Sequence, residues 1–124
     1  MPSISQIALY VRDLPKVAEF YTRHFDFRAT TEAPDKIRLT PSNGGCDIVL
    51  LQASKGHRIG QSVVKIVFDV EDVQAFKKAS AGKGLVWGSI HSGLGYEFCN
   101  ARDPAKNLIR ISNSRFRKAP KSAP

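Results

Sequence analysis

The sequence contains few of the residues that form disulfide frameworks or metal sites. Among 124 residues there are two cysteines, Cys46 and Cys99, and three histidines, His24, His57 and His91. The cysteines could form one bridge in principle, but they lack CxxC or histidine-rich spacing, so we expect reduced, structural thiols. The histidines are far apart in the chain and two lie in predicted loops, which argues against one ligand set.

The sequence also lacks a long apolar run. No stretch approaches the roughly 20 apolar residues of a membrane span. Residues 1–4 lead directly into a predicted strand, without the basic and apolar regions of a signal peptide. We therefore expect a cytoplasmic protein with no membrane partner. At 42% hydrophobic residues, the chain is long enough for one domain with a single core and too short for two.

Acidic residues are scarce as well, with 11 Asp and Glu against 19 Lys and Arg, for a net charge of +8. Four of these charges, Arg115, Arg117, Lys118 and Lys121, fall in the acid-free segment 114–124. Its composition predicts a basic, poorly ordered tail, which leaves about +4 on the folded body. A basic tail can bind nucleic acid, but no nucleic-acid fold signature accompanies it, so nucleic acid is not an expected partner.

An internal repeat is the main organising feature of the chain. Residues 6–14 and 65–73 each read as an apolar strand that ends in an acidic turn before a helix-like stretch. The two copies start 59 residues apart, close to half the chain length. This spacing predicts that one supersecondary unit has been duplicated.

The first copy reads as a βαβββ module. Strand 4–11 precedes a helix with Asp13 as its N-cap, Pro15 in its first turn and apolar residues at helical spacing up to Phe25. Three strands are then predicted at 27–32, 36–40 and 47–52, separated by turn residues.

The second copy repeats this order. Strand 63–70, a helix capped by Asp72 over 73–81, and strands 85–90, 96–100 and 108–112 are predicted. We therefore predict an α+β fold in which residues 1–113 form a single domain. Module one spans about 4–53, a linker about 54–62 and module two about 63–113, with the tail at 114–124.

These features together resemble the vicinal oxygen chelate superfamily, which includes glyoxalase I, extradiol dioxygenases and bleomycin-resistance proteins. The matching parts are residues 11–14, Phe20-Tyr21, residues 70–73 and the turn Asp103-Pro104. The final turn departs from the pattern, since Ala105-Lys106 stands where the family often has Asp-Gly. The resemblance implies a curled mixed sheet around a cleft with the helices outside, and a homodimer.

The resemblance also implies where a metal would bind, because the superfamily's metal enzymes use one ligand from the first and one from the last strand of each module. The matching positions are Gln6, Leu50, Lys65 and Arg110. The repeat supports this, with shifts of 59 and 60 residues between the paired positions. Strand alternation puts the four on the face opposite Ile7, Leu9, Ile66, Phe68, Ile109 and Ile111.

Of these four positions, only Gln6 offers a donor that a divalent cation prefers. Lys65 and Arg110 would bring positive charge to the place of the cation. We therefore expect no metal and no other cofactor, and the metal-dependent reactions of the family are not expected either.

A small-molecule site remains, with a mostly apolar floor and a few polar groups. The sequence predicts a metal-free small-molecule binding protein of the glyoxalase and bleomycin-resistance type. Its ligand would be anionic or polar, with Lys65 and Arg110 receiving a carboxylate or phosphate. The predicted ligand-binding residues are Gln6, Tyr10, Leu50, Lys65, Asp69, Trp87 and Arg110.

Three alternatives stay open at this point. Lys65 or Arg110 could pair with Asp69 or Glu97 and only satisfy the fold. A glyoxalase-like lyase or isomerase, or a dioxygenase-related enzyme with a degenerate site, could use Lys65 or Glu97 as acid or base. The basic tail could instead carry an interaction whose strength falls steeply with salt.

Overall fold

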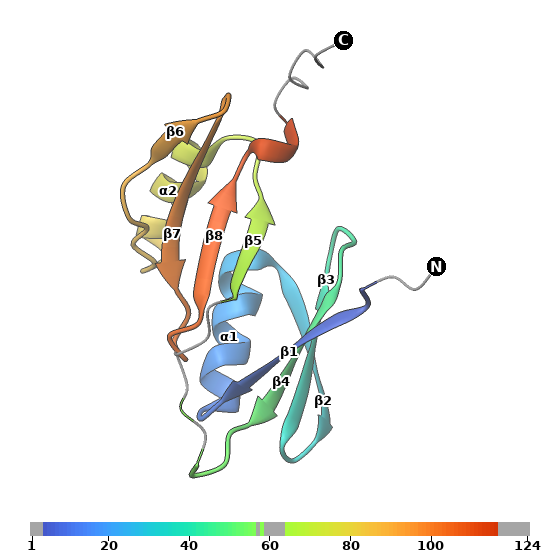
Figure 1. The fold of residues 1–124 in the computed structure, drawn as a ribbon. Coiled ribbons are helices and arrows are strands. Elements are labelled where there is room, and N and C mark those ends of the chain that lie inside the picture. Colours follow the sequence, from blue (N-terminus) through green and yellow to red (C-terminus); the bar gives the residue numbers. More distant parts are fainter. Residues whose placement is uncertain (1–3, 57, 59–63, 117–124) are drawn as a thin grey trace. The chain divides into compact units, whose positions relative to one another are not determined.

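The protein folds into two sets of βαβββ elements, as predicted (Figure 1). The structure, a computed structural model, describes residues 4–56, 58 and 64–116. The first set is β1 (Gln6–Val11), α1 (Leu14–Phe25), β2 (Phe27–Ala33), β3 (Lys36–Pro41) and β4 (Asp47–Gln52). The second is β5 (Lys65–Asp69), α2 (Val73–Gly82), β6 (His91–Gly93), β7 (Tyr96–Arg102) and β8 (Leu108–Ser112), followed by a short 3₁₀ helix, Ser114–Phe116.

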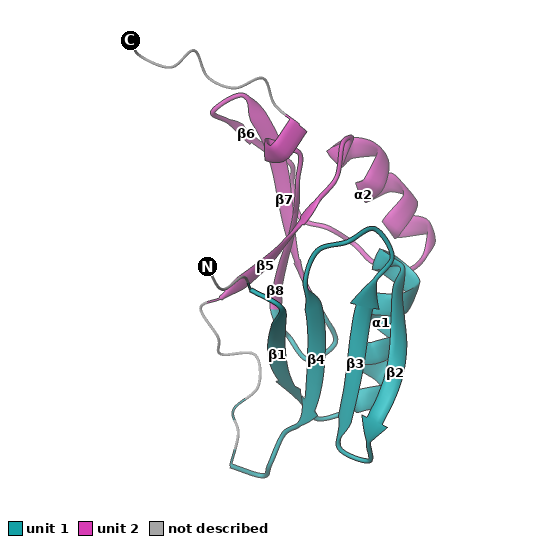
Figure 2. Ribbon diagram, turned by 90° about the vertical axis from the view of Figure 1, so that its right-hand side faces the viewer, with its two compact units in different colours: residues 1–62, 103–107 teal, residues 63–102, 108–124 magenta. Residues whose placement is uncertain are grey.

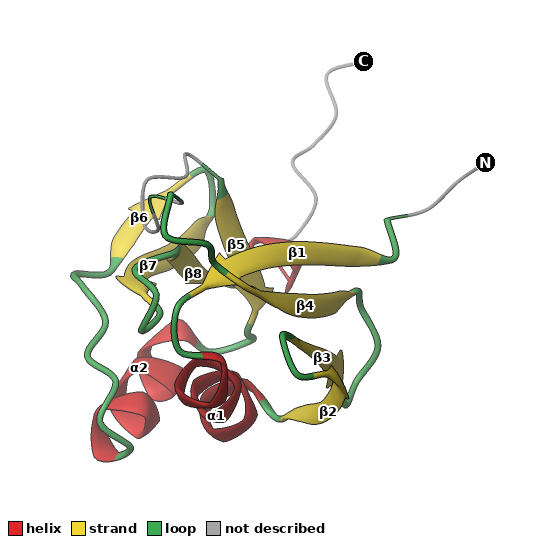
Figure 3. Ribbon diagram, turned by 90° about the horizontal axis from the view of Figure 1, so that it is seen from below, coloured by secondary structure: helices red, strands yellow, loops and turns green. Residues whose placement is uncertain are grey.

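The two sheets have the same strand order, which confirms the α+β class and the duplication. The orders are β1-β4-β3-β2 and β5-β8-β7-β6. In each sheet the first and last strands of the module pair in parallel, and the other strands pair antiparallel. Both sheets are open, mixed and four-stranded (Figure 3).

The chain divides into two compact units, coloured separately in Figure 2. Unit 1 contains residues 1–62 together with 103–107, and unit 2 contains 63–102 and 108–124. Unit 1 therefore includes the turn between β7 and β8, which comes from the second half of the sequence. Most of the predicted linker, 54–62, and the predicted start of the fifth strand at Val63 lie outside the described residues.

Both helices begin at the predicted aspartates. The Asp13 carboxylate accepts a hydrogen bond from the Lys16 backbone N–H at 3.1 Å, and Asp72 accepts one from Ala75 at 3.0 Å. Each cap satisfies one backbone donor that the first helical turn leaves unpaired. The buried face of α1 packs on the first sheet through residues at helical spacing, namely Leu14, Val17, Ala18, Phe20 and Tyr21.

One predicted strand is misplaced. Residues 85–90 are irregular, and the edge strand β6 lies just after them at His91–Gly93. The reason is the turn at Leu94 and Gly95, where both residues have positive φ, 56° and 81°. A two-residue turn of this kind matches the twist of a hairpin, so it pairs His91–Gly93 with β7.

Other predictions about the chain can be compared with the described residues. Both cysteines are free thiols. Ser114–Phe116, the start of the predicted tail, form the 3₁₀ helix, and residues 117–124 lie outside the described part. Neither described α-helix has the length and apolar character needed to cross a membrane.

The turn at 103–107 is held in unit 1 by a buried carboxylate. The Asp103 side chain, only 4% exposed, accepts a hydrogen bond of 2.6 Å from the Tyr21 hydroxyl. It also accepts bonds from the backbone N–H groups of Ala105 and Asn107 and from the Asn107 amide. Four donors thus compensate the loss of water around a charge that would otherwise be costly to bury.

We expect Tyr21→Phe to lower the free energy of unfolding by about 1–3 kcal/mol, because it leaves the buried carboxylate one donor short. Asp103→Ala should cost more, since it also leaves the turn amides without an acceptor. Urea denaturation gives both values. Thr22→Ala, on the exposed side of the same helix, is the control and should change stability by less than about 0.5 kcal/mol. Equal values for Tyr21→Phe and Thr22→Ala would contradict this role of the hydroxyl.

The same contact predicts a loss of stability at alkaline pH. Burial, and next the charge of Asp103, raise the pKa of Tyr21 far above its usual value near 10. A raised native pKa contributes stability that is complete below the unfolded value and is lost as pH rises above about 10. The stability difference between the wild type and Tyr21→Phe should therefore shrink from pH 10 upward, measured by denaturation at pH 8 to 11. A difference that stays constant over this range would refute the assignment.

Candidate functional site

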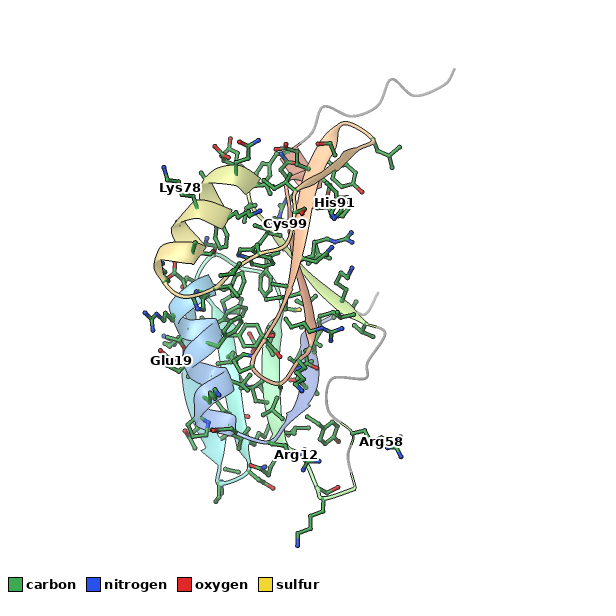
Figure 4. The ribbon with its side chains drawn as sticks, turned by 90° about the vertical axis from the view of Figure 1, so that its left-hand side faces the viewer. Arg12, Glu19, Arg58, Lys78, His91 and Cys99 are labelled. Atoms are coloured by element: carbon green, nitrogen blue, oxygen red, sulfur yellow. The ribbon has the colours of Figure 1, made fainter. Side chains whose placement is uncertain are left out.

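Each sheet has one face that carries most of its buried apolar side chains and an opposite face, called the open face below, on which Val49 and Ser112 are nonetheless buried. In the second sheet, Ile66, Ile109, Ile111 and Cys99 form the buried face. The register places the other side chains on the open face: Lys65, Val67 and Asp69 of β5, Leu108, Arg110 and Ser112 of β8, Tyr96, Phe98, Asn100 and Arg102 of β7, and His91 of β6. Figure 4 labels His91 and Cys99, which belong to opposite faces of this sheet.

Three of the predicted ligand-binding residues therefore share one surface. Arg110 of β8 lies opposite Val67 of β5 in the parallel ladder. Lys65 and Asp69 lie on β5 two residues before and two residues after Val67. Lys65 and Arg110 are half-buried and Asp69 is exposed. The predicted alternation of inward and outward side chains is therefore confirmed for β5 and β8.

Arg110 is fixed by two neutral partners. Its Nε donates to Asn100 Oδ1 at 2.8 Å, and its Cζ lies 4.0 Å from the centroid of the Phe98 ring. The His91 ring stacks on Phe98 from the other neighbouring strand, with centroids 5.2 Å apart and planes inclined by 29°. Cation–π contact and one hydrogen bond hold the guanidinium by its face and its Nε edge. The edge formed by the two Nη atoms makes no hydrogen bond within the described structure.

The predicted internal ion pairs do not form among the described residues. Neither Lys65 nor Arg110 lies within 4.0 Å of a carboxylate there. Asp69 is bound instead by Arg115 of the 3₁₀ helix, at 3.4 Å. Glu97 lies on the opposite face, where its backbone N–H is bound by Asn113 and its carboxylate is 3.5 Å from the Gln74 amide of α2. Glu97 and Lys65, the two candidates for an acid or base, therefore lie on opposite faces of the second sheet.

The first sheet requires a correction. Gln6 and Tyr10 lie on its open face, but Leu50 pairs with Leu9 on the face that α1 covers and is fully buried. The residues that share the open face with Gln6 are Asp47, Val49 and Leu51, not Leu50. The error arose because residues 48–51 are all apolar, so alternation gives no sign of which side faces outward. The position that corresponds to Arg110 is Val49, since Val49 pairs with Ala8 as Arg110 pairs with Val67.

Trp87 also differs from its predicted place. It is only 3% exposed, and its ring packs edge-on against Phe76 of α2, with centroids 6.4 Å apart. It therefore belongs to the core beside α2 and not to the open face. Residues 85–90 form no strand, so Trp87 is not presented on a sheet face.

A residue that the sequence did not indicate, Arg38, dominates the open face of the first sheet. Its Nη1 donates to Gln6 Oε1 and to Asp47 Oδ2, both at 3.0 Å, and its Nε donates to Glu32 at 2.8 Å. Lys36 joins Glu32 at 3.3 Å. Glu32 sits at an irregularity in the β2–β3 register, and such bulges redirect a side chain.

This cluster shifts two pKa values. The hydrogen bond from Arg38, and then Lys36, lower the pKa of Glu32, while the bonds to Glu32 and Asp47 raise the pKa of Arg38. Two carboxylates thus neutralise the Arg38 guanidinium. The alternation of residues 36–40 places Arg38 on the polar side of its strand, but it does not show the partners of the guanidinium.

The residues at the family's metal positions do not fit a divalent cation. After the correction they are Gln6, Val49, Lys65 and Arg110, of which two are cationic and one is aliphatic. Gln6 Oε1 and Asp47 Oδ2 on this face are already bound to the Arg38 guanidinium. Hard cations need several free oxygen or imidazole donors, and this donor set does not provide them.

A hollow in unit 1 lies away from these residues. It is lined by Arg12, Asp13, Leu14, Pro15, Thr31, Pro34, Ile37 and Gln52. Its polar groups serve the fold, since Asp13 caps α1 and the Gln52 amide donates to the Arg12 carbonyl at 2.8 Å. We do not assign it a ligand.

Comparison with known proteins identifies the family. The model of the Glyoxalase/Bleomycin resistance protein/Dioxygenase superfamily matches residues 3–111. The chain belongs to this superfamily. No curated protein matches it.

Solved structures share the fold of this superfamily member. UcmS2 superposes with a TM-score of 0.78 and 16% identity, covering 92% of this chain and 99% of its own. TnmS3, an antibiotic binding protein from Streptomyces sp. CB03234, has a TM-score of 0.75 and 16% identity over 90% and 94% of the two chains. A lactoylglutathione lyase from Agrobacterium tumefaciens has a TM-score of 0.74 and 20% identity over 94% and 96%. At these identities the likeness concerns the fold alone, and the last two differ in function.

The Gln6 and Asp47 oxygens that could bind a metal are already bound to Arg38, and the second sheet contributes cations at the corresponding positions. We therefore expect that divalent metals do not stabilise the protein. Metal-stripped protein should show no change in melting temperature with Mg²⁺, Mn²⁺, Ni²⁺ or Zn²⁺ in the presence of a weak competing chelator, because a ligand stabilises only what it binds. Differential scanning fluorimetry tests this. A saturable increase for one of these ions would show that the donor argument is wrong.

Proposed function

We propose that the protein is a metal-free small-molecule binding protein and that the open face of its second sheet receives an anionic group of the ligand. The observation that carries this proposal is the state of Arg110. Its guanidinium is fixed in place, half-buried and paired with no carboxylate within the described residues. A fixed cation with an unused pair of Nη donors matches the bidentate geometry of a carboxylate or phosphate.

The first sheet provides an internal comparison. Arg38 and Val49 pair across β3 and β4 as Asn100 and Arg110 pair across β7 and β8. Each sheet therefore carries one guanidinium at the same level of its ladder. Arg38 is neutralised by Glu32 and Asp47, whereas Arg110 is held by an amide and a ring. This difference supports the second sheet as the anion-binding face.

The surroundings of Arg110 favour a ligand with an apolar part. Val67 is 49% exposed beside it, and Phe98 and Tyr96 lie further along the same face. Apolar surface with a few convergent polar groups is typical of small-molecule sites. Gln6 and Tyr10 remain candidate contacts on the open face of the first sheet, and a homodimer remains an expectation that light scattering can test.

Asn100→Asp is the sharpest test of this function. A carboxylate 2.8 Å from Arg110 Nε would neutralise the guanidinium with almost no change in shape, as Glu32 does for Arg38. We expect wild-type protein to be stabilised by benzoate or phenyl phosphate, and Asn100→Asp to lose affinity by about tenfold or more, measured by isothermal titration calorimetry at constant ionic strength.

Two further variants show whether a loss of anion affinity comes from the Arg110 charge or from a general loss of positive charge. Arg110→Met should lose the same affinity, and Arg28→Met, which removes an exposed cation from the first sheet, should lose none. Anion binding that is equal in the wild type, Asn100→Asp and Arg110→Met would refute the proposed site. Failure of the wild type to bind any of these anions would refute the anion-binding function.

A further inference from the structure

A single aromatic ring separates Arg110 from a histidine on the open face of the second sheet. The His91 ring of β6 stacks on the Phe98 ring of β7 with centroids 5.2 Å apart, and the Arg110 Cζ of β8 lies 4.0 Å from the same Phe98 centroid. Because β6 and β8 are the two neighbours of β7, these groups approach the ring from opposite sides. The His91 centroid and the Arg110 Cζ are therefore at most 9.2 Å apart, which is 5.2 Å plus 4.0 Å.

The register of the sheet shows where this stack lies. One row of the open face crosses all four strands through Asp69, Ser112, Phe98 and His91. The Arg110 backbone lies two residues before Ser112 on β8, but its Cζ lies over the Phe98 ring, so the guanidinium extends toward this row. The Nη edge of Arg110 is therefore at the same end of the face as His91.

The polar edge of the His91 ring is available to a ligand. The side chain is exposed, and its stacking contact with Phe98 uses the face of the ring. Neither ring nitrogen makes a hydrogen bond or an ion pair within the described residues. A neutral imidazole has one N–H donor, and an imidazolium has two donors and a positive charge. His91 and Arg110 are thus both held by a ring face, with hydrogen-bonding edges that the described residues leave unused.

The charges around His91 leave room for an anion. The other titratable or charged groups on its face are Tyr96, Lys65, Asp69, Arg102 and Arg110. Asp69 is the one carboxylate among them; it lies at the far end of the row, three strands from His91, and is bound to Arg115 at 3.4 Å. Glu97, beside Phe98 in the sequence, belongs to the opposite face. Among the described residues, no carboxylate of this face therefore lies between His91 and Arg110.

We propose that His91 is a second binding residue of this site and that the ligand is a short dicarboxylate, with one carboxylate on the Nη edge of Arg110 and the other on His91. This inference rests on the proposed function and names the ligand class. Each charge-assisted hydrogen bond spans about 2.8 Å, so a body of a few carbon atoms can bridge the two anchors. An aromatic body would also pack against Phe98 and Tyr96, whose rings are 6.0 Å apart.

Benzoate and isophthalate, which share a ring and differ by one carboxylate, test the second anchor. Both are titrated calorimetrically into the full chain at pH 6 and pH 8, at constant ionic strength. Both ligands stay ionised at these pH values, because carboxyl groups ordinarily have a pKa near 4. We expect isophthalate to bind at least about tenfold more tightly than benzoate at pH 6, through the added charged hydrogen bond. This preference should fall at pH 8, because histidine ordinarily loses its charge between pH 5 and 8.

His91→Phe is the decisive variant, because it keeps an aromatic ring to stack on Phe98 and removes both nitrogens. It should bring the affinities for isophthalate and benzoate within about threefold of each other and abolish the pH dependence of the preference. The matched control is Ser92→Ala, at the next position of β6 and on the opposite face, which should keep the wild-type preference at both pH values.

The outcomes separate this inference from the proposed function. Equal affinity of the wild type for benzoate and isophthalate would overturn the second anchor and leave an anion-binding protein. A preference that His91→Phe retains in full, or that is the same at pH 6 and pH 8, would overturn it as well. Binding of neither ligand would overturn this inference together with the proposed function.

Discussion

The buried carboxylate of Asp103 is the constraint on which the arrangement of unit 1 depends. A charge that is 4% exposed is tolerated only because the Tyr21 hydroxyl, two backbone amides and the Asn107 side chain all donate to it. These bonds fix the turn 103–107 against α1; β7 ends just before this turn and β8 begins just after it. Unit 1 is therefore completed by a turn that comes from the second half of the chain.

Duplication has given two sheets of the same topology that use their cations differently. Arg38 is enclosed by oxygens of its own sheet, so its charge serves the fold. Arg110 is oriented by Asn100 and Phe98, neither of which carries charge, so its attraction for an anion is retained. Orientation by neutral groups is a general way to prepare a charged residue for a ligand, because it removes motion without removing charge.

Much of the fold could be predicted from the sequence, since capping aspartates, glycine turns and the repeat all indicate the same module twice. The face of β5 and β8 could also be predicted, because Lys65, Asp69 and Arg110 alternate with isoleucine and phenylalanine. The face of β4 could not, since an apolar run such as 48–51 has no alternation, and Leu50 was placed on the wrong side. The contacts of Arg38 and of Asn100 depend on which strands are neighbours, and a single sequence does not contain that information.

The composition of unit 1 has a consequence for how the protein is made. Tyr21 and its acceptor are separated by 82 residues, and the turn that completes the unit is synthesised only after β7. Contacts that close so long a loop form late, because the entropy of closure must be offset first. During synthesis, α1 is therefore made well before the carboxylate that its Tyr21 hydroxyl binds. The repeat divides the sequence into two similar halves, but unit 1 is completed only by a turn from the second half.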